Sequence, residues 1–128
     1  MSNSSYFILY VADQQRSTDF FSAVLGMAPR LHVVGMTEYD LPGGGVLGLM
    51  PEDGIRKLLG NALPDPARAR GVPRCEIYLV VPEPDAFHVR AIAAGARELS
   101  PMQTRNWGHA VAYSLDIDGH VLAFAAQL

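Results

Sequence analysis

The sequence predicts an α+β protein built from two βαβββ modules, and three observations lead to that prediction. First, Gly43-Gly-Gly-Val-Leu-Gly-Leu49 returns as Asp118-Gly-His-Val-Leu-Ala-Phe124. Second, Tyr6-Phe-Ile-Leu-Tyr-Val-Ala-Asp13 is echoed by Glu76-Ile-Tyr-Leu-Val-Val-Pro-Glu83. Third, each of the latter two segments reads as an apolar strand that ends in an acidic residue and precedes a helix-like stretch closed by glycine. A repeat of this length indicates two copies of one supersecondary unit sharing a core.

The first module is expected over about residues 5–50. Residues 5–12 are rich in Tyr, Phe, Ile and Val, which favour a strand. Asp13 can cap a helix over about 14–25, and Gly26 can end it in a left-handed conformation. The apolar stripe of that helix consists of Phe20, Phe21, Val24 and Leu25. Three short strands follow at about 30–34, 36–41 and 45–50, separated by glycine-containing turns.

Residues 51–73 are expected to be a linker, because Gly and Pro recur throughout and leave room for only one or two helical turns. The linker is long enough to cross the molecule or to cover a cleft. The second module then spans about 74–126. It consists of a strand at 74–81, a helix at 83–94 and strands near 97–102, 108–115 and 120–126. Expected packing residues of its helix are Phe87, Val89, Ile92 and Ala93. Asp116-Ile-Asp-Gly119 forms the last hairpin turn.

Composition narrows the functional class. The chain has 128 residues, 49% of them hydrophobic and 18% charged, which predicts a single globular domain over 1–128. A net charge of −3 argues against nucleic acid as a partner. No apolar run reaches the roughly 20 residues of a membrane span, and no signal peptide is recognisable. Cys75 is the single cysteine and is expected to be a small core residue, so we expect a cytoplasmic protein without disulfides.

Two segments resemble the vicinal oxygen chelate superfamily, the glyoxalase/bleomycin resistance protein/dioxygenase family. Tyr10-Val-Ala-Asp-Gln-Gln-Arg-Ser-Thr-Asp-Phe-Phe-Ser-Ala-Val-Leu-Gly-Met27 is similar to its strand-Asp-helix opening. Trp107-Gly-His-Ala-Val-Ala-Tyr-Ser-Leu-Asp-Ile-Asp-Gly-His-Val-Leu-Ala-Phe124 is similar to its closing hairpin, with Ile117 in place of the usual proline. The resemblance implies that the modules form a cup-shaped mixed sheet with helices on the outside. It also implies a homodimer.

The family's metal enzymes place one ligand on the first and last strand of each module. The resemblance assigns those places here to Tyr6, Gly48, Glu76 and Ala123, and the repeat supports this because Tyr6 matches Glu76 and Gly48 matches Ala123. Gly48 and Ala123 have no donor atom, and a tyrosine phenol, with a pKa of about 10, is a poor ligand for most divalent ions. We therefore expect no cofactor; a divalent metal held through Glu76 is the disfavoured alternative.

Strand alternation predicts which side chains face the cup. The expected ligand-binding residues are Tyr6, Ile8, Met50, Glu76, Tyr78, Trp107, His109 and Tyr113. Aromatic and Met side chains beside one carboxylate suit a planar or cationic organic molecule. Gly48 and Ala123 should leave space for it. Glu76 and His109 are also the candidate catalytic residues, as an acid–base pair.

Plainer interpretations exist for the same residues. The tyrosines can be packing residues, His109 can be an ordinary strand residue, and Glu76 can pair with Arg74 or Arg105. Three other histidines are expected to be solvated: His32, His88 and His120. Three aspartates are expected to be cap and turn residues: Asp13, Asp116 and Asp118.

Three functions remain open at this point. The first is a metal-independent protein that binds a small organic molecule, as in sequestration or resistance. The second is a glyoxalase-like lyase or isomerase, or a dioxygenase-related enzyme, that uses Glu76 and His109. The third is a structural dimer module whose cup is filled by its own side chains.

Overall fold

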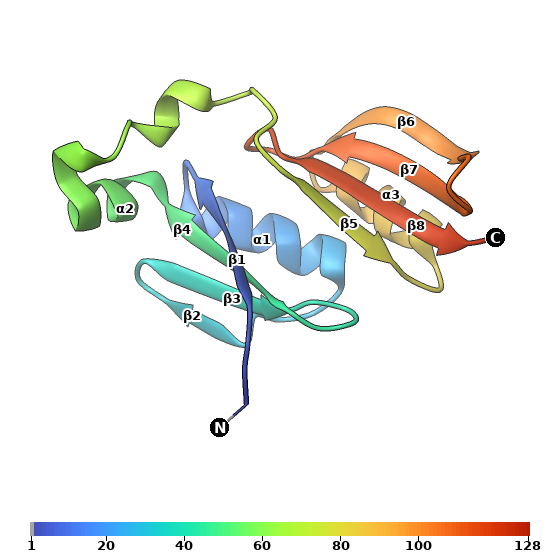
Figure 1. Ribbon diagram of the computed structural model, residues 1–128, viewed down its shortest axis with the longest axis horizontal. Coiled ribbons are helices and arrows are strands. Elements are labelled where there is room, and N and C mark those ends of the chain that lie inside the picture. Colours follow the sequence, from blue (N-terminus) through green and yellow to red (C-terminus); the bar gives the residue numbers. More distant parts are fainter. Residues whose placement is uncertain (1) are drawn as a thin grey trace.

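The computed structural model describes residues 2–128 and contains two four-stranded sheets with helices (Figure 1). The first half contains β1 (Tyr6–Val11), α1 (Gln14–Leu25), β2 (Leu31–Val33), β3 (Met36–Asp40) and β4 (Val46–Pro51). The second half contains β5 (Glu76–Val80), α3 (Pro84–Ala93), β6 (Arg97–Thr104), β7 (His109–Leu115) and β8 (Val121–Gln127). Between them lie α2 (Glu52–Leu59) and the 3₁₀ helices η1 (Gly60–Ala62) and η2 (Pro66–Ala69). The predicted α+β class, with βαβββ occurring twice, is confirmed.

The two modules have the same topology, and the first strand of each pairs with the last in an equivalent register. Sheet A has the order β1-β4-β3-β2, and sheet B has the order β5-β8-β7-β6. In each, the first strand runs parallel to the last. Ile8 is opposite Gly48 in sheet A, and Tyr78 is opposite Ala123 in sheet B. The repeat in the sequence therefore marks positions that are equivalent in the structure.

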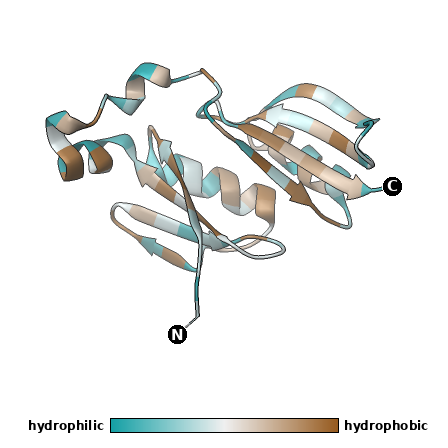
Figure 2. Ribbon diagram, in the orientation of Figure 1, coloured by the Kyte–Doolittle hydropathy of each residue, from teal (hydrophilic) through white to brown (hydrophobic). Residues whose placement is uncertain are grey.

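The sheets lie side by side, with β1 and β5 as their facing edges (Figure 1). The helices α1 and α3 contact each other on one side of the sheets, the side on which the core lies. The opposite faces of both sheets, which we call the cup faces, are free of these helices. Hydropathy follows this arrangement, with apolar segments on the strands of both sheets and on α1 (Figure 2). None of the helices within 2–128 combines the length and apolar character needed to cross a membrane.

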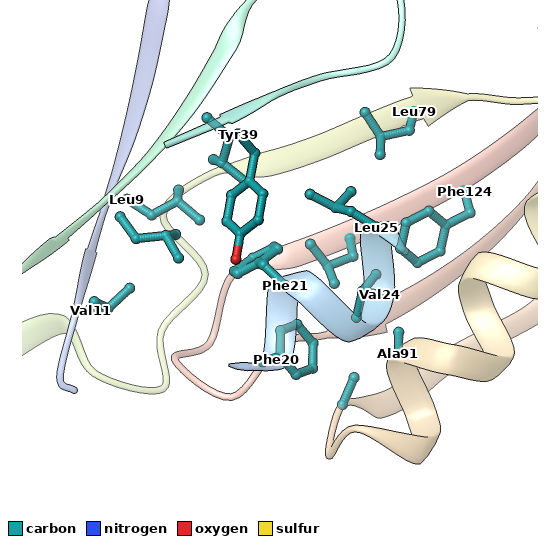
Figure 3. Close-up of a cluster of buried hydrophobic side chains, with 14 of the residues drawn as sticks. Leu9, Val11, Phe20, Phe21, Val24, Leu25, Tyr39, Leu79, Ala91 and Phe124 are labelled. Atoms are coloured by element: carbon teal, nitrogen blue, oxygen red, sulfur yellow. The ribbon is translucent and has the colours of Figure 1, made fainter. Parts of the chain in front are cut away.

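One hydrophobic core joins the modules. In Figure 3, Phe21, Val24 and Leu25 of α1 lie between sheet A residues and Phe124 of sheet B. The fully buried aromatic residues Tyr39, Phe21 and Phe124 come from both modules. Each such side chain contributes about 1.5–3 kcal/mol by its removal from water. The two sheets therefore share their main core, and sheet B has in addition a small separate cluster of Val111, Ala123 and Ala125.

Helix α1 begins and ends as the sequence predicts. Asp13 is its N-cap, and its Oδ1 accepts a hydrogen bond from the Arg16 amide at 2.9 Å. Gly26 ends the helix with φ of 67°, which a residue with a Cβ adopts only at a cost. Arg90 of α3 also contacts this end, because its Nε donates to the Val24 carbonyl at 3.1 Å. The second module thus stabilises the negative end of the first module's helix dipole.

The packing face of α3 differs from the prediction. Val89, Ile92 and Ala93 are exposed, and of the expected residues only Phe87 packs against the core. The buried residues are Pro84, His88 and Ala91, which share a face because they are three or four positions apart. His88 is therefore not solvated. Its Nε2 lies 2.9 Å from Glu98 Oε2, so a partner on β6 allows the imidazole to face inward.

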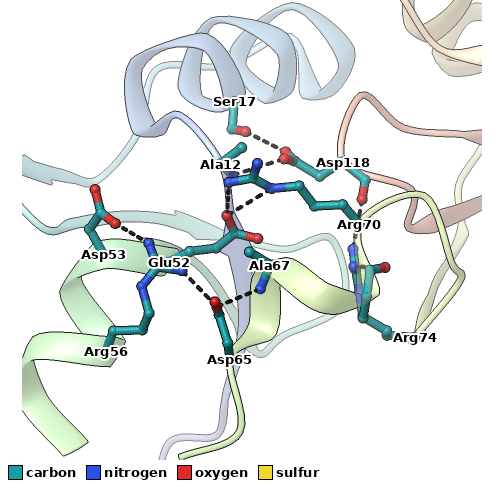
Figure 4. A network of polar contacts seen from close by, with 11 residues as sticks. Ala12, Ser17, Glu52, Asp53, Arg56, Asp65, Ala67, Arg70, Arg74 and Asp118 are labelled. Carbon is teal, nitrogen blue, oxygen red and sulfur yellow. Dashed lines mark hydrogen bonds and ion pairs between the residues drawn. The ribbon is translucent and has the colours of Figure 1, made fainter. Parts of the chain in front are cut away.

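The linker is more ordered than its composition suggests. Ile55 is the buried apolar residue of α2, while Leu58 and Leu59 are exposed. Glu52 is only 4% exposed, and Arg70 beyond η2 forms an ion pair with it (Figure 4). A buried carboxylate needs such a partner. The linker therefore folds back on itself as three short helical segments, and an ion pair joins its start to the residue after η2.

Candidate functional site

Side-chain alternation in β1 and β5 separates the core from the cup faces as predicted. Leu9 and Val11 are buried in the core, whereas Tyr6 and Ile8 are more than 40% exposed. In β5, Leu79 is buried in the core. Residues at positions 76, 78 and 80 lie on the opposite face by the period of two. The residues selected from the sequence as facing the cup on these strands thus lie on the outer faces.

A pocket of about 440 Å³ lies between the facing edges of β1 and β5. We call it the seam pocket. Four of the eight predicted ligand-binding residues line it: Tyr6, Ile8, Glu76 and Tyr78. Its remaining lining consists of Phe7, Leu9, Leu41, Leu47, Cys75 and Ile77. An apolar lining with one carboxylate is the chemistry expected of a site for a small organic molecule.

The other predicted ligand-binding residues lie elsewhere. Trp107, His109 and Tyr113 belong to the cup face of sheet B but do not line the seam pocket. Met50 is half-buried on β4, and a Cβ added to Gly54 of α2 would lie 3.9 Å from its Cγ. Met50 is thus partly covered by the linker helix. The sequence identifies the strand faces correctly, but those faces hold two groups of residues rather than one.

A second, smaller pocket adjoins the seam pocket, and Cys75 lines both of them. This pocket, of about 300 Å³, is lined by Ile8, Leu9, Tyr10, Pro66, Arg74, Cys75 and His120. Cys75 is exposed, so its prediction as a core residue is wrong; it lies just before the edge strand β5. Partial burial raises the pKa of the Cys75 thiol, and the charge of Asp116 raises it further. The thiol is therefore not activated as a nucleophile.

A chain of hydrogen bonds joins Trp107, Tyr78 and His109 on sheet B. Trp107 Nε1 donates to Tyr78 Oη at 2.9 Å, and Tyr78 Oη lies 2.6 Å from His109 Nδ1. An indole N–H can only donate, so Tyr78 accepts from Trp107. The direction of the bond between Tyr78 Oη and His109 Nδ1 is set by the tautomer of the imidazole. The small residues Ala123 and Ala125 of β8 pack beneath Tyr78 and so leave room for its ring.

Glu76 has no ion-pair partner anywhere in residues 2–128, so the alternative pairing with Arg74 or Arg105 does not occur. The negative charge of Glu76 instead acts on the phenol of Tyr113. Burial is the main cause that raises the pKa of Tyr113, and the negative charge of Glu76 raises it further. The Arg105 guanidinium, 5.2 Å from the centroid of the Tyr113 ring, acts in the opposite direction. Tyr113 therefore remains a neutral phenol between two charges.

The four positions assigned to metal ligands do not suit a metal. A Cβ at Gly48 would lie 3.1 Å from Ile8 Cγ1 and 3.2 Å from Met36 Sδ, so the space expected there is already filled. Ala123 is fully buried against Tyr78 and Tyr113. Across residues 2–128, no three His, Cys, Asp or Glu side chains come together as possible metal ligands. The donor set of this chain thus does not fit the metal site of the family's metalloenzymes.

On the cup face of sheet A, the charges are paired within the sheet. Arg30 donates from Nε to Glu38 and from Nη1 to Asp40, both at 3.0 Å. Its Nη2 also donates to the hydroxyl of Tyr6 at 2.7 Å. The single guanidinium thereby satisfies two carboxylates and one phenol. Sheet A presents little free charge to a ligand.

The turn between β7 and β8 connects the modules, which the sequence did not reveal. Asp118 Oδ1 accepts from the Ala12 amide at 3.0 Å, and its Oδ2 accepts from Ser17 Oγ at 2.7 Å (Figure 4). Arg74 donates to the Asp118 carbonyl from the linker side. Gly119 approaches the linker so closely that a Cβ would lie 3.0 Å from Gly71 Cα. The turn therefore fastens α1 and the linker to sheet B.

His120 in the same turn is 2% exposed, so its prediction as a solvated histidine is wrong. Its Nδ1 lies 3.1 Å from Asp116 Oδ2, and its Nε2 accepts from Arg74 Nη2 at 3.0 Å. Asp116 also accepts from the amides of Asp118 and His120, which confirms its role in the turn. Arg74, 46 positions away in the sequence, is what allows the imidazole to be buried.

Comparison with known proteins identifies relatives of this architecture. The family model described as Glyoxalase/Bleomycin resistance protein/Dioxygenase superfamily matches residues 4–124. A glyoxalase-related enzyme from Fulvimarina pelagi superposes with a TM-score of 0.76 at 22% identity, covering 99% of this chain and 89% of that chain. TioX from Micromonospora sp. ML1 superposes with a TM-score of 0.66 at 22% identity, covering 99% and 100%. A family enzyme from Burkholderia phytofirmans PsJN gives 0.75 at 19% identity, covering 97% and 98%. No curated protein matches the sequence.

Proposed function

Because this chain belongs to the glyoxalase/bleomycin resistance protein/dioxygenase superfamily, whose fold serves many chemistries, we propose its function from the site itself. The proposed function is metal-independent binding of a small aromatic or cationic organic molecule, of the sequestration or resistance type. The observation that carries it is the apolar seam pocket of about 440 Å³, whose lining includes Glu76, a carboxylate without an ion pair within residues 2–128. This volume accommodates a drug-sized molecule.

The lining of the seam pocket favours a cationic ligand. Glu76 supplies a negative charge that no side chain of residues 2–128 neutralises through an ion pair. Tyr6 and Tyr78 line the same pocket, and aromatic faces attract cations. Sequestration requires only affinity, so it needs neither a metal nor a general acid.

An enzymatic function through Glu76 and His109 has less support. A general acid and a general base must both reach one substrate. Glu76 lines the seam pocket, whereas His109 does not, and its Nδ1 is engaged by Tyr78. Lyase, isomerase or dioxygenase-related chemistry through this pair therefore remains the second candidate.

Benzyltrimethylammonium is a suitable probe of the proposed function, since it is both aromatic and cationic. We expect it to quench Trp107 fluorescence, because Trp107 is bonded to Tyr78 in the pocket wall. Glu76→Gln should weaken binding about tenfold, equivalent to about 1.4 kcal/mol. The matched control is Glu83→Gln, an exposed carboxylate without an ion pair. Equal affinity for wild type and Glu76→Gln would contradict the role of Glu76.

Metal content is a separate test. Protein purified without chelator should retain no stoichiometric Ni, Zn, Mn or Fe. Retention of such a metal by wild type, together with its loss in Glu76→Ala, would overturn the metal-independent function in favour of the enzymatic one.

A cytoplasmic homodimer completes the proposal. Large apolar side chains are exposed on both modules and on the linker, among them Phe7, Val89 and Leu58, and a second copy could cover such surfaces. Sedimentation should then give a mass of about 28 kDa, twice the 13.9 kDa of the chain. A mass near 14 kDa at micromolar concentration would contradict the dimer. The single cysteine suits a reducing compartment.

A further inference from the structure

The seam pocket is a slot between two sheet edges rather than a hollow in the face of one sheet. Its lining includes the consecutive residues 6–9 of β1 and 75–78 at the start of β5. Because successive side chains of a strand point to opposite faces, these two runs include both core-facing and cup-facing side chains. β1 and β5 belong to different sheets and do not pair with each other. The space between them is therefore bordered by two strand edges.

The backbone of both edges presents hydrogen-bonding groups to this slot. The Val46 amide donates to the Ser5 carbonyl at 2.9 Å, and at the equivalent place in sheet B the Val121 amide donates to a carbonyl at 3.2 Å, that of Cys75. Alternate residues of a strand bond to the same neighbour, so the odd-numbered residues of β1 and β5 bond to β4 and β8. Their even-numbered residues direct N–H and C=O groups into the slot: Tyr6, Ile8, Tyr10, Glu76, Tyr78 and Val80. Within residues 2–128, no hydrogen bond joins these backbone groups to another segment.

The free row on β1 ends after Tyr10. The next amide in the row, that of Ala12, donates to Asp118 Oδ1 at 3.0 Å. Pro66 of the linker and His120 line the adjoining smaller pocket at this end. The row from Tyr6 to Tyr10 extends over roughly 17 Å, at about 3.4 Å per residue. An occupant that pairs with this edge is therefore short, about three to five residues in extended form.

The side chains that line the slot suit an occupant with both apolar and basic groups. A strand in the slot directs alternate side chains to the core side and to the cup side. Leu9, Leu47 and Ile77 line the core side, and Glu76 is the carboxylate of the cup side. Within residues 2–128, Glu76 forms no ion pair. A basic residue between two apolar residues matches this pattern.

We propose that the seam pocket binds a short, extended, cationic peptide as a strand added between β1 and β5. The peptide backbone bonds to the free groups of both edges, which is how peptides commonly extend an exposed sheet edge. Its apolar side chains pack against the core side of the slot, and its basic side chain pairs with Glu76. This inference rests on the proposed small-molecule function and names the class of ligand.

Calorimetry of the full chain with acetyl-Val-Lys-Val-amide tests the added strand. A matched probe has the same side chains but carries methyl groups on its backbone nitrogens, which removes the donors. It should bind about tenfold more weakly. A probe with norleucine in place of the lysine should also bind about tenfold more weakly to the wild type. Glu76→Gln should abolish this preference for lysine, whereas Glu83→Gln, which changes an exposed carboxylate outside the slot, should retain it.

Hydrogen exchange followed by NMR gives a reading that needs no variant. The bound peptide should slow exchange at the amides of Ile8 and Tyr78, which point into the slot. Exchange at Phe7 and Ile77 should not change, because these amides already bond within their sheets. This alternation distinguishes backbone pairing from simple coverage of the surface.

Each remaining outcome contradicts a defined part of the inference. Equal affinity for the peptide and its N-methylated form, or unchanged exchange at Ile8 and Tyr78, would overturn strand addition. Binding of benzyltrimethylammonium without binding of the peptide would overturn the peptide and leave the proposed function standing. Binding of neither probe at millimolar concentration would overturn both. Slow exchange at the same two amides in the free protein, together with a dimer mass in sedimentation, would overturn the peptide in favour of a second copy in the slot.

Discussion

Sheets A and B have the same topology, yet their charged groups are arranged differently. In sheet A, Arg30 neutralises Glu38 and Asp40 and binds Tyr6. In sheet B, Glu76 stands at the position equivalent to Tyr6 and forms no ion pair within residues 2–128. The repeated sequence therefore accounts for the fold of both modules, whereas the charge arrangement of a candidate site differs between them.

The equivalent small residues show a second contrast. Gly48 is crowded by Ile8 and Met36, whose side chains fill the place above it. Ala123 lies beneath Tyr78 and Tyr113, and Tyr78 also lines the seam pocket. In both sheets the chain has replaced the space for a metal ligand with packing. Only in sheet B does that packing carry hydroxyl groups.

The largest effect should come from breaking the core that the sheets share. Phe124→Ala removes a fully buried ring of sheet B that packs beside Leu25 of α1, and it should destabilise the protein by about 3–5 kcal/mol. Chemical denaturation should show one transition for both halves. The control, Val89→Ala at an exposed site of α3, should change stability by less than about 0.5 kcal/mol. Separate transitions for the two sheets would contradict a shared core.

A smaller loss is expected at the turn that fastens sheet B to α1. Asp118→Ala removes two hydrogen bonds to a carboxylate, from the Ala12 amide and Ser17 Oγ, and should cost about 1.5–3 kcal/mol. Hydrogen exchange should accelerate at the first turn of α1. The equivalent position in sheet A is Gly43, which has no side chain and makes no such contact, so Gly43→Ala should not affect α1. Unchanged exchange in Asp118→Ala would show that the turn does not hold the helix.

The contrast between Gly48 and Ala123 can be measured directly. Gly48→Ala should destabilise by about 1–3 kcal/mol, because Ile8 and Met36 must move to admit a methyl group. Ala123→Gly should cost roughly 1–2 kcal/mol, from backbone freedom and from the loss of a fully buried methyl group. Thermal unfolding gives both values. A stabilising effect of Gly48→Ala would mean that space is available above Gly48 after all.

The smallest effect is electrostatic. Since burial is the main cause of the raised pKa of Tyr113, Glu76→Gln should lower that pKa but leave it above 10. The pKa of Tyr113 is higher in the folded protein than in the unfolded chain. The contribution of Tyr113 to the free energy of unfolding is therefore complete below about pH 10, and it is lost as the pH rises through the pKa of the folded protein. NMR of the tyrosine ring carbons follows the titration. Glu38→Gln on sheet A is the control. An equal change in the pKa of Tyr113 in both variants would contradict a specific effect of the Glu76 charge on Tyr113.

Much of the fold could be predicted because its signals are local. The stripe Phe20, Phe21, Val24 and Leu25, bounded by Asp13 and Gly26, determines α1 within one segment. Alternation in β1 and β5 likewise separates core residues from cup residues. The packing face of α3 could not be predicted, because Val89 and Ile92 are apolar yet point away, and His88 faces inward owing to Glu98 on another strand.

The candidate site was only partly predictable for the same reason. Glu76, Tyr78, Trp107 and His109 are recognisable by residue type and strand face. Their connections are not, because Trp107 and Tyr78 are 29 positions apart and meet only across sheet B. The position of Arg105 over the ring of Tyr113 is equally hidden, because the two residues meet only when β6 and β7 pair.

The most direct test of the difference between the sheets is to map where a ligand binds. In a titration of isotope-labelled protein with benzyltrimethylammonium, the account predicts NMR shifts along β1 and β5 and at Leu41 and Leu47, which line the seam pocket. The β2–β3 hairpin of sheet A should not respond. Shifts of equal size at Glu38 and Met36 of β3, or shifts confined to sheet A, would contradict a binding site formed by sheet B and the seam.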